Sequence, residues 1–135
     1  MLFRSDRIRL HKVTPDVYDW YAAADAFILA SDVESLPRSM MEAMAFEAVP
    51  IVSAVFGVPE LLTDGETGIL FQPSSESSVE DALRRYLSLE PSARERLAVR
   101  GRELIEKERS SQRYAAEVRQ LIDRLVADPS ALPLG

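Results

Sequence analysis

Two glutamates, Glu34 and Glu42, are the side chains of this sequence best placed to act together on a ligand. Seven residues separate them, and a strand-like apolar run, 26–30, lies shortly before the first one. A strand, a polar loop with one acid and a helix with a second acid place two carboxylates at the carboxyl end of a parallel strand, where ligands of open α/β sheets bind. Ionised carboxylates accept hydrogen bonds, so the pair suits a ligand that carries hydroxyl groups.

The helix between the two acids is predicted to begin near Pro37. Proline has a fixed φ and no N–H group, so it suits the first turn of a helix and disfavours the interior. Glu34 then lies in the loop, and Glu42 lies in the helix and leans toward that loop. The free N–H groups of a first helical turn bind anions. The segment therefore suits a sugar nucleotide, and the simpler alternative is one loop glutamate and one solvated helix glutamate.

Strands and helices alternate along the chain, which predicts a parallel α/β sheet. Spacing of i, i+3, i+4, i+7 also predicts a buried helix face, made of Met41, Met44, Ala45 and Ala48. The predicted strands are 7–10, 26–30, 50–53 and 68–71. Four helices are predicted at 16–24, 38–47, 59–62 and 91–108. A further helix is capped by Ser77 or Ser78 and ends near 89, and the last one begins at Ser110 or Ser111 and ends near 127.

Composition indicates one domain, residues 1–135, with 47% apolar and 28% charged residues as in globular proteins. The formal net charge of −6 argues against a nucleic-acid partner. Asp25 interrupts the longest apolar run, so no membrane span is expected. The absence of cysteine excludes disulfides and fits a cytoplasmic protein.

Asp64-Gly65-Glu66 has the form of an acidic metal pair, but Asp-Gly is more typical of a turn.

Five stretches, 21–31, 34–45, 49–53, 57–60 and 64–71, resemble in content and order the C-terminal domain of GT-B glycosyltransferases of retaining family 4, the glycosyl transferases group 1. The resemblance covers residues 18–73. It implies an α/β fold, a partial Rossmann-like parallel sheet of about four strands with flanking helices and a helical C-terminal tail. It also implies transfer of a sugar from a nucleotide diphosphate sugar to an acceptor hydroxyl with retention, and no metal or other cofactor.

Roles for individual residues also come from the resemblance. Glu34 corresponds to an acid that contacts hydroxyls of the donor sugar and is the catalytic candidate, and Glu42 corresponds to one that accepts hydrogen bonds from the ribose. Backbone amides of 35–38 would face the sugar, those of 39–40 the ribose and phosphate, and the loop at 13–14 the nucleobase. The implied donor-binding residues are Glu34, Ser35, Leu36, Pro37, Arg38, Ser39, Met40, Glu42, Val13 and Thr14.

The sequence departs from the family pattern at three places. The segment 35–37, Ser-Leu-Pro, stands where the family usually has Gly-Phe-Gly, and Pro37 has no N–H with which to bind a sugar. Phe46-Glu47 replaces a usual Cys-Gly pair, and Phe56 replaces the first glycine of a Gly-Gly pair.

The family domain has six strands in the order 3-2-1-4-5-6, and this sequence corresponds only to strands from the third onward. We therefore expect a fragment, a truncated gene product or one part of a split enzyme, without the Arg and Lys that clamp the diphosphate and without the N-terminal acceptor domain. We expect no sugar transfer by the isolated chain, and self-association through an unpaired sheet edge. The alternatives are a non-catalytic nucleotide-sugar-binding or interaction module and a sugar-nucleotide epimerase of similar architecture.

Overall fold

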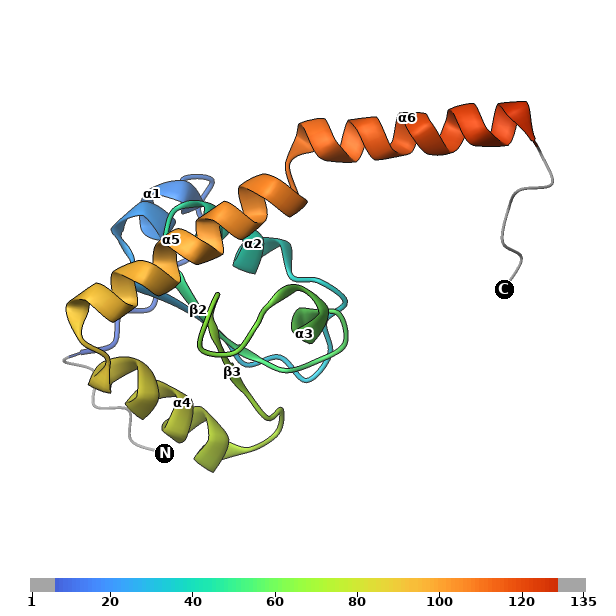
Figure 1. Ribbon diagram of the computed structural model, residues 1–135. Coiled ribbons are helices and arrows are strands. Elements are labelled where there is room, and N and C mark those ends of the chain that lie inside the picture. Colours follow the sequence, from blue (N-terminus) through green and yellow to red (C-terminus); the bar gives the residue numbers. More distant parts are fainter. Residues whose placement is uncertain (1–6, 129–135) are drawn as a thin grey trace.

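A parallel three-stranded sheet lies at the centre of the fold (Figure 1). The computed structural model describes residues 7–128. The strands β1 (Ala26–Leu29), β2 (Val49–Ser53) and β3 (Ile69–Phe71) are ordered β1-β2-β3, with Ile51 of β2 opposite Ile28 on one side and Ile69 on the other. All five residues of the central strand are buried. The predicted parallel α/β sheet is confirmed.

The sheet has three strands rather than the four that we predicted, because the strand predicted at 7–10 is absent. That segment is irregular and exposed, with Leu10 exposed by 95%. A strand needs a neighbouring strand to receive its backbone hydrogen bonds, and an apolar pattern alone does not provide one. Within residues 7–128, β1 pairs only with β2, so its other edge carries no strand.

The described residues form six helices: α1 (Val17–Ala23), α2 (Arg38–Ala45), α3 (Val58–Leu61), α4 (Glu76–Ser88), α5 (Pro91–Glu108) and α6 (Ser111–Ala127). The predicted bounds of the last two are confirmed, and Ser110 caps α6. The predicted cap of α4 is wrong, because Ser75 accepts the capping hydrogen bond from the Ser78 amide. The Ser78 hydroxyl instead accepts a hydrogen bond of 2.8 Å from the Gln72 amide.

The buried face of α2 differs from the predicted one. Met44 is fully buried and Ala48, just beyond the helix, is also buried, as predicted, but Met41 is only partly buried and Ala45 is exposed. Met40, with 0% exposure, lies in the core cluster in place of Ala45. The reason is that α2 packs against α5 as well as against the sheet, so two neighbours rather than one select its buried positions.

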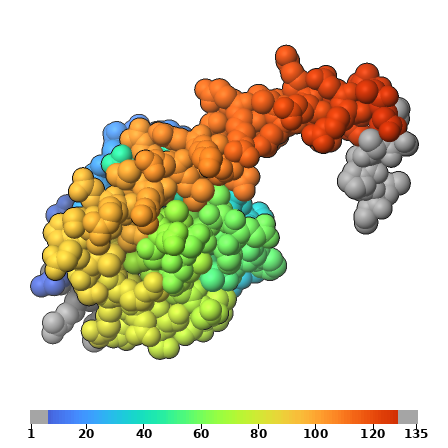
Figure 2. All heavy atoms as spheres, viewed as in Figure 1, coloured from blue at the N-terminus to red at the C-terminus, as the bar shows by residue number. Residues whose placement is uncertain are grey.

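The long helix α5 lies across the body of the fold, whereas α6 extends away from it (Figures 1 and 2). Leu97, Gly101 and Ile105 make up the buried face of α5. No residue of α6 is buried. Within residues 7–128, no helix has the length and apolar character needed to cross a membrane.

Tyr86 joins α4 to the start of β1. Its hydroxyl donates a hydrogen bond of 3.0 Å to the carbonyl of Asp25, and burial raises the pKa of this phenol. Tyr86→Phe should lower the free energy of unfolding by about 1 kcal/mol, because the Asp25 carbonyl loses one of its two donors and keeps only the Val49 amide. Urea unfolding measures this change. Tyr114→Phe, on the exposed face of α6, is the control, and an equal loss in both variants would contradict the assignment.

Candidate functional site

The carboxylate of Glu34 is held in place from the end of the central strand. The buried hydroxyl of Ser53, the last residue of β2, donates a hydrogen bond of 2.6 Å to the Ser31 carbonyl. The Ser31 hydroxyl in turn donates a hydrogen bond of 3.0 Å to Glu34 Oε1. Glu34 is partly buried. Its carboxylate is therefore fixed at the carboxyl ends of β1 and β2, as the sequence predicted.

The loop after β2 lies directly against the loop that carries Glu34. The Gly57 amide donates a hydrogen bond of 3.0 Å to the Ser35 carbonyl. A Cβ atom added at Gly57 would lie 2.3 Å from that same oxygen, closer than atoms can approach without a shift of the backbone. Glycine is thus required here for a close approach of two backbones, and this approach sets the distance between the two loops.

Glu42 lies on α2 and is paired with Arg38. Arg38 Nε donates a hydrogen bond of 2.9 Å to Glu42 Oε1, across one turn of the helix. The Arg38 side chain is 84% exposed and that of Glu42 is 24% exposed. Burial, and then the nearby carboxylate of Glu42, raise the pKa of Tyr21 on α1. The pair leaves Glu42 Oε2 to accept a further hydrogen bond.

The N-terminus of α2 faces the same loop. Pro37 is the N-cap, which confirms the predicted start of the helix, and the first helical bond runs from the Met41 amide to the Pro37 carbonyl. Leu36 packs against the core and Met40 is fully buried, so their side chains are not available to a ligand. Backbone N–H groups of the first turn, which include those of Ser39 and Met40, have no partner within the helix.

The segment predicted to border a nucleobase is exposed and irregular. Val13 is fully exposed and Thr14 partly exposed, and both precede α1 in a region without regular structure. They line a hollow of about 340 Å³ with Trp20, whose ring lies 4.3 Å from that of His11. No lining residue of this hollow comes from the segment 31–42. The structure therefore brings Glu34 close to Ser35 and the start of α2. Val13 and Thr14 line a hollow formed by residues 11–20, and their contact with a nucleobase stays a prediction.

The Asp64-Gly65 pair forms a turn. Gly65 has a φ of +76°, a conformation that glycine adopts without strain. Asp64 Oδ1 accepts a hydrogen bond of 2.8 Å from the Leu70 amide, and both carboxylate oxygens accept from Arg85 Nη2 at 2.9 Å. Asp64 thus connects the turn to β3 and α4. In the part of the chain that the structure describes, no cluster of three or more metal-ligating side chains occurs.

Three residues of this site were missed by sequence reasoning: Ser31, Ser53 and Gly57. A serine three residues before Glu34 was a readable signal, since Ser side chains form short-range hydrogen bonds. Gly57 was seen only as part of a matching stretch. Its contact with Ser35, like that of Ser53 with Ser31, joins residues 22 positions apart and depends on the pairing of β1 with β2.

The family model "Glycosyl transferases group 1" matches residues 3–104. This chain belongs to that family. The match confirms the family resemblance read from the five stretches. The mixed α/β fold matches that of GT-B glycosyltransferases of known structure, and the described part of this chain has three strands.

Relatives of the family share both sequence and fold with the chain. The glycogen synthase of Granulibacter bethesdensis is 35% identical over 94 residues, which is 62% of this chain and 20% of that enzyme. The sucrose-phosphate synthase of Thermosynechococcus elongatus is 30% identical with a TM-score of 0.74, over 80% of this chain and 27% of that one. The structure of Anabaena HepE in complex with UDP has a TM-score of 0.78, over 83% of this chain and 31% of that one. Its sequence identity is only 17%, so this similarity is one of fold. The chain thus spans about a fifth to a third of the length of these relatives.

Proposed function

We propose that this chain binds a nucleotide diphosphate sugar and serves as the donor-binding part of a retaining glycosyltransferase. The observation that carries the proposal is the hydrogen-bonded series from Ser53 through Ser31 to Glu34, which holds one carboxylate at the carboxyl ends of two parallel strands. Ligands of open α/β sheets bind at that edge. A protein of the same fold, HepE, was crystallised with UDP, which supports a nucleotide ligand.

Glu34 accepts hydrogen bonds from hydroxyls of the donor sugar in this proposal, and Glu42 accepts them from the ribose. The backbone at Ser35 lies on the sugar side. The N–H groups at Ser39 and Met40 lie toward the ribose and phosphate, since the first turn of a helix attracts anions. Arg38 is exposed beside Glu42, and its charge adds to the attraction for a diphosphate.

The chemistry proposed for the whole enzyme is transfer of the sugar to an acceptor hydroxyl without a metal ion. The chain's part is to orient the donor and to stabilise the leaving diphosphate. An acceptor domain completes the cleft, and we expect it to be supplied by another part of the protein or by a separate chain. The lack of cysteine fits the expected cytoplasmic location.

Donor binding by the chain itself is expected to be weak, with a Kd of about 1 mM or higher, which corresponds to only about 4 kcal/mol of binding free energy. Titration of the chain with UDP-glucose, ADP-glucose and GDP-mannose, followed by ¹H–¹⁵N NMR, measures it. We expect the amide shifts to cluster within residues 31–43. Shifts that cluster at α4 or α6 instead would contradict the assignment of the site.

The alternative is a non-catalytic module that keeps the fold and the binding edge. Pro37 favours it, because a residue without an N–H group occupies the cap of the helix that faces the ligand. Release of nucleoside diphosphate, assayed with and without acceptor alongside the titration, separates the two. Acceptor-dependent release after addition of a related N-terminal domain supports the transferase, and binding without release in the same mixture supports the module.

A further inference from the structure

Phe56 is an exposed aromatic side chain on a strained backbone. It is 69% exposed, and its φ is +41°, in the left-handed region that residues with a side chain seldom adopt. Three of the other exposed aromatic residues have ring partners: Phe46 stacks on Tyr18 with 5.7 Å between ring centroids, and Trp20 contacts His11. Tyr114 on α6 is exposed without a ring contact in the described part of the chain, as Phe56 is, but its backbone is helical. No such ring contact holds Phe56 within residues 7–128. Phe56 thus differs from the other exposed aromatic residues of the described part in combining exposure with a positive φ.

The position of Phe56 is fixed relative to the proposed donor site. The next residue, Gly57, is hydrogen-bonded to the Ser35 carbonyl in the loop that carries Glu34. Phe56 therefore lies at the edge of that loop, one residue from its closest contact. Strained residues gather at ligand sites, where the surrounding structure holds them in place.

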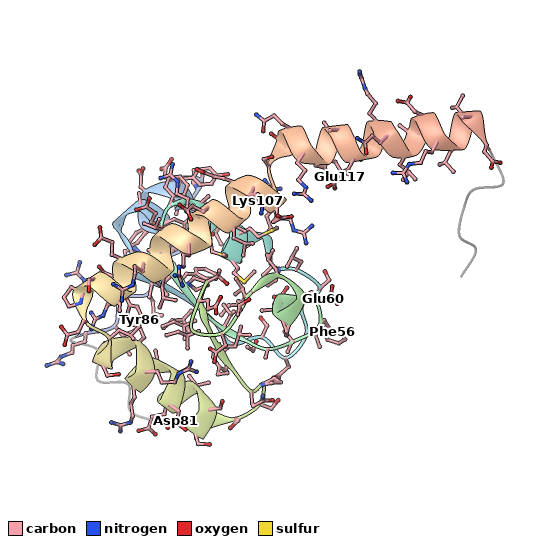
Figure 3. All side chains as sticks on the ribbon, viewed as in Figure 1. Phe56, Glu60, Asp81, Tyr86, Lys107 and Glu117 are labelled. Carbon is pink, nitrogen blue, oxygen red and sulfur yellow. The ribbon has the colours of Figure 1, made fainter. Side chains whose placement is uncertain are left out.

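A carboxylate, that of Glu60, belongs to the short helix α3 that follows Phe56. The Glu60 amide donates a hydrogen bond of 3.2 Å to the Gly57 carbonyl in the first turn of α3, and the Glu60 side chain is exposed. Figure 3 shows Phe56 and Glu60 together at the same side of α3. The face of an aromatic ring is electron-rich and attracts groups with partial positive charge, and a carboxylate accepts hydrogen bonds from hydroxyls.

We propose that Phe56 is a platform for the pyranose ring of a saccharide, with Glu60 as acceptor for one of its hydroxyls. The C–H bonds on one face of a pyranose carry partial positive charge and meet the phenyl ring, while the hydroxyls at its rim meet carboxylates. This inference rests on the proposed function, since a sugar is bound at the adjoining loop. The pyranose is the sugar of the donor or that of the acceptor, and both have the same ring chemistry.

The substitution Phe56→Gly distinguishes a role of the ring in stability from a role in saccharide binding. Phe56→Gly removes the ring and at the same time removes the strain, because glycine adopts positive φ freely. If the ring served stability, this variant would melt at a lower temperature. We expect its melting temperature to be unchanged or higher, and its affinity for saccharide to fall by about three- to ten-fold, the value of one aromatic contact.

The test is an NMR titration of the 135-residue chain and its variants with UDP, UDP-glucose and maltotriose. Phe56→Gly removes the ring, Phe56→Leu keeps apolar bulk without a π face, and Tyr114→Ala removes an aromatic side chain of similar exposure, 71%, on α6. We expect upfield ring-current shifts of saccharide C–H protons with the unchanged chain and with Tyr114→Ala, and their loss in both Phe56 variants.

Each outcome decides a specific point. Weaker binding of UDP-glucose with unchanged binding of UDP assigns the platform to the donor sugar, and weaker binding of maltotriose alone assigns it to the acceptor. The proposal is overturned if Phe56→Gly binds both UDP-glucose and maltotriose as tightly as the unchanged chain does. It is also overturned if the unchanged chain binds neither saccharide. If UDP still binds with amide shifts at 31–43, the proposed donor site is supported even though the role of Phe56 is rejected. Failure of the Phe56 proposal is therefore distinguishable from failure of the proposed function.

Discussion

Gly57→Ala should lower the free energy of unfolding by roughly 2–4 kcal/mol, the sum expected for one overpacked contact and one lost hydrogen bond. The added methyl group would lie 2.3 Å from the Ser35 carbonyl oxygen. Because the obstacle is backbone and not the end of a flexible side chain, the loops after β1 and β2 must separate. That movement breaks the hydrogen bond from Gly57 to Ser35 and displaces Glu34, so donor binding should weaken together with stability.

Gly65→Ala is the matched control. Gly65 has a positive φ of 76° but has no atom within 4 Å of an added Cβ, so alanine there should cost only the backbone strain, about 1–2 kcal/mol. Urea unfolding and ¹H–¹⁵N spectra of both variants provide the comparison. We expect amide shifts throughout 31–36 in Gly57→Ala and only local shifts in Gly65→Ala. Equal costs with an undisturbed 31–37 loop in both would show that the contact is not rigid.

Glu42→Ala should weaken the binding of a nucleoside diphosphate by about ten-fold or more, since a hydrogen bond to a charged group contributes roughly 1.5–3 kcal/mol. Glu34→Ala should leave that binding nearly unchanged, because UDP lacks the sugar that Glu34 contacts in the proposed function. With UDP-glucose as ligand, both variants should bind more weakly. Binding of UDP and UDP-glucose to each variant, measured by NMR titration, tests this separation of roles.

The control for Glu42 is Glu106→Ala. Glu106 on α5 accepts a hydrogen bond of 2.8 Å from Arg102 four residues earlier, the same arrangement as Arg38 and Glu42 on α2. Removal of an ordinary surface pair of this kind has little effect on stability and should have none on UDP binding. Equal losses in Glu34→Ala and Glu42→Ala with UDP, or a loss in Glu106→Ala as large as that in Glu42→Ala, would contradict the assigned roles.

Much of the architecture follows from local chemistry and could be read from the sequence. Pro37 marks the start of α2 and Pro91 the start of α5, because proline is accepted in a first helical turn and disfavoured further inside. Asp64-Gly65 makes a turn because glycine accepts positive φ. The alternation of strands and helices predicted a parallel sheet. The order of the five matching stretches placed the chain among glycosyltransferases and marked Glu34 and Glu42 as the acids to examine.

Features that depend on distant neighbours could not be read in this way. Residues 7–10 have the apolar pattern of a strand but lack a neighbouring strand within the described residues, so they do not form one. The buried face of α2 includes Met40 rather than Ala45 because α5 packs against it. The hydrogen bonds from Ser53 to Ser31 and from Gly57 to Ser35 form only once β1 and β2 are paired, since pairing aligns the ends of both strands. Local preference thus determines where elements begin and end, whereas the orientation of the Glu34 carboxylate and the exposure of Phe56 result from tertiary packing.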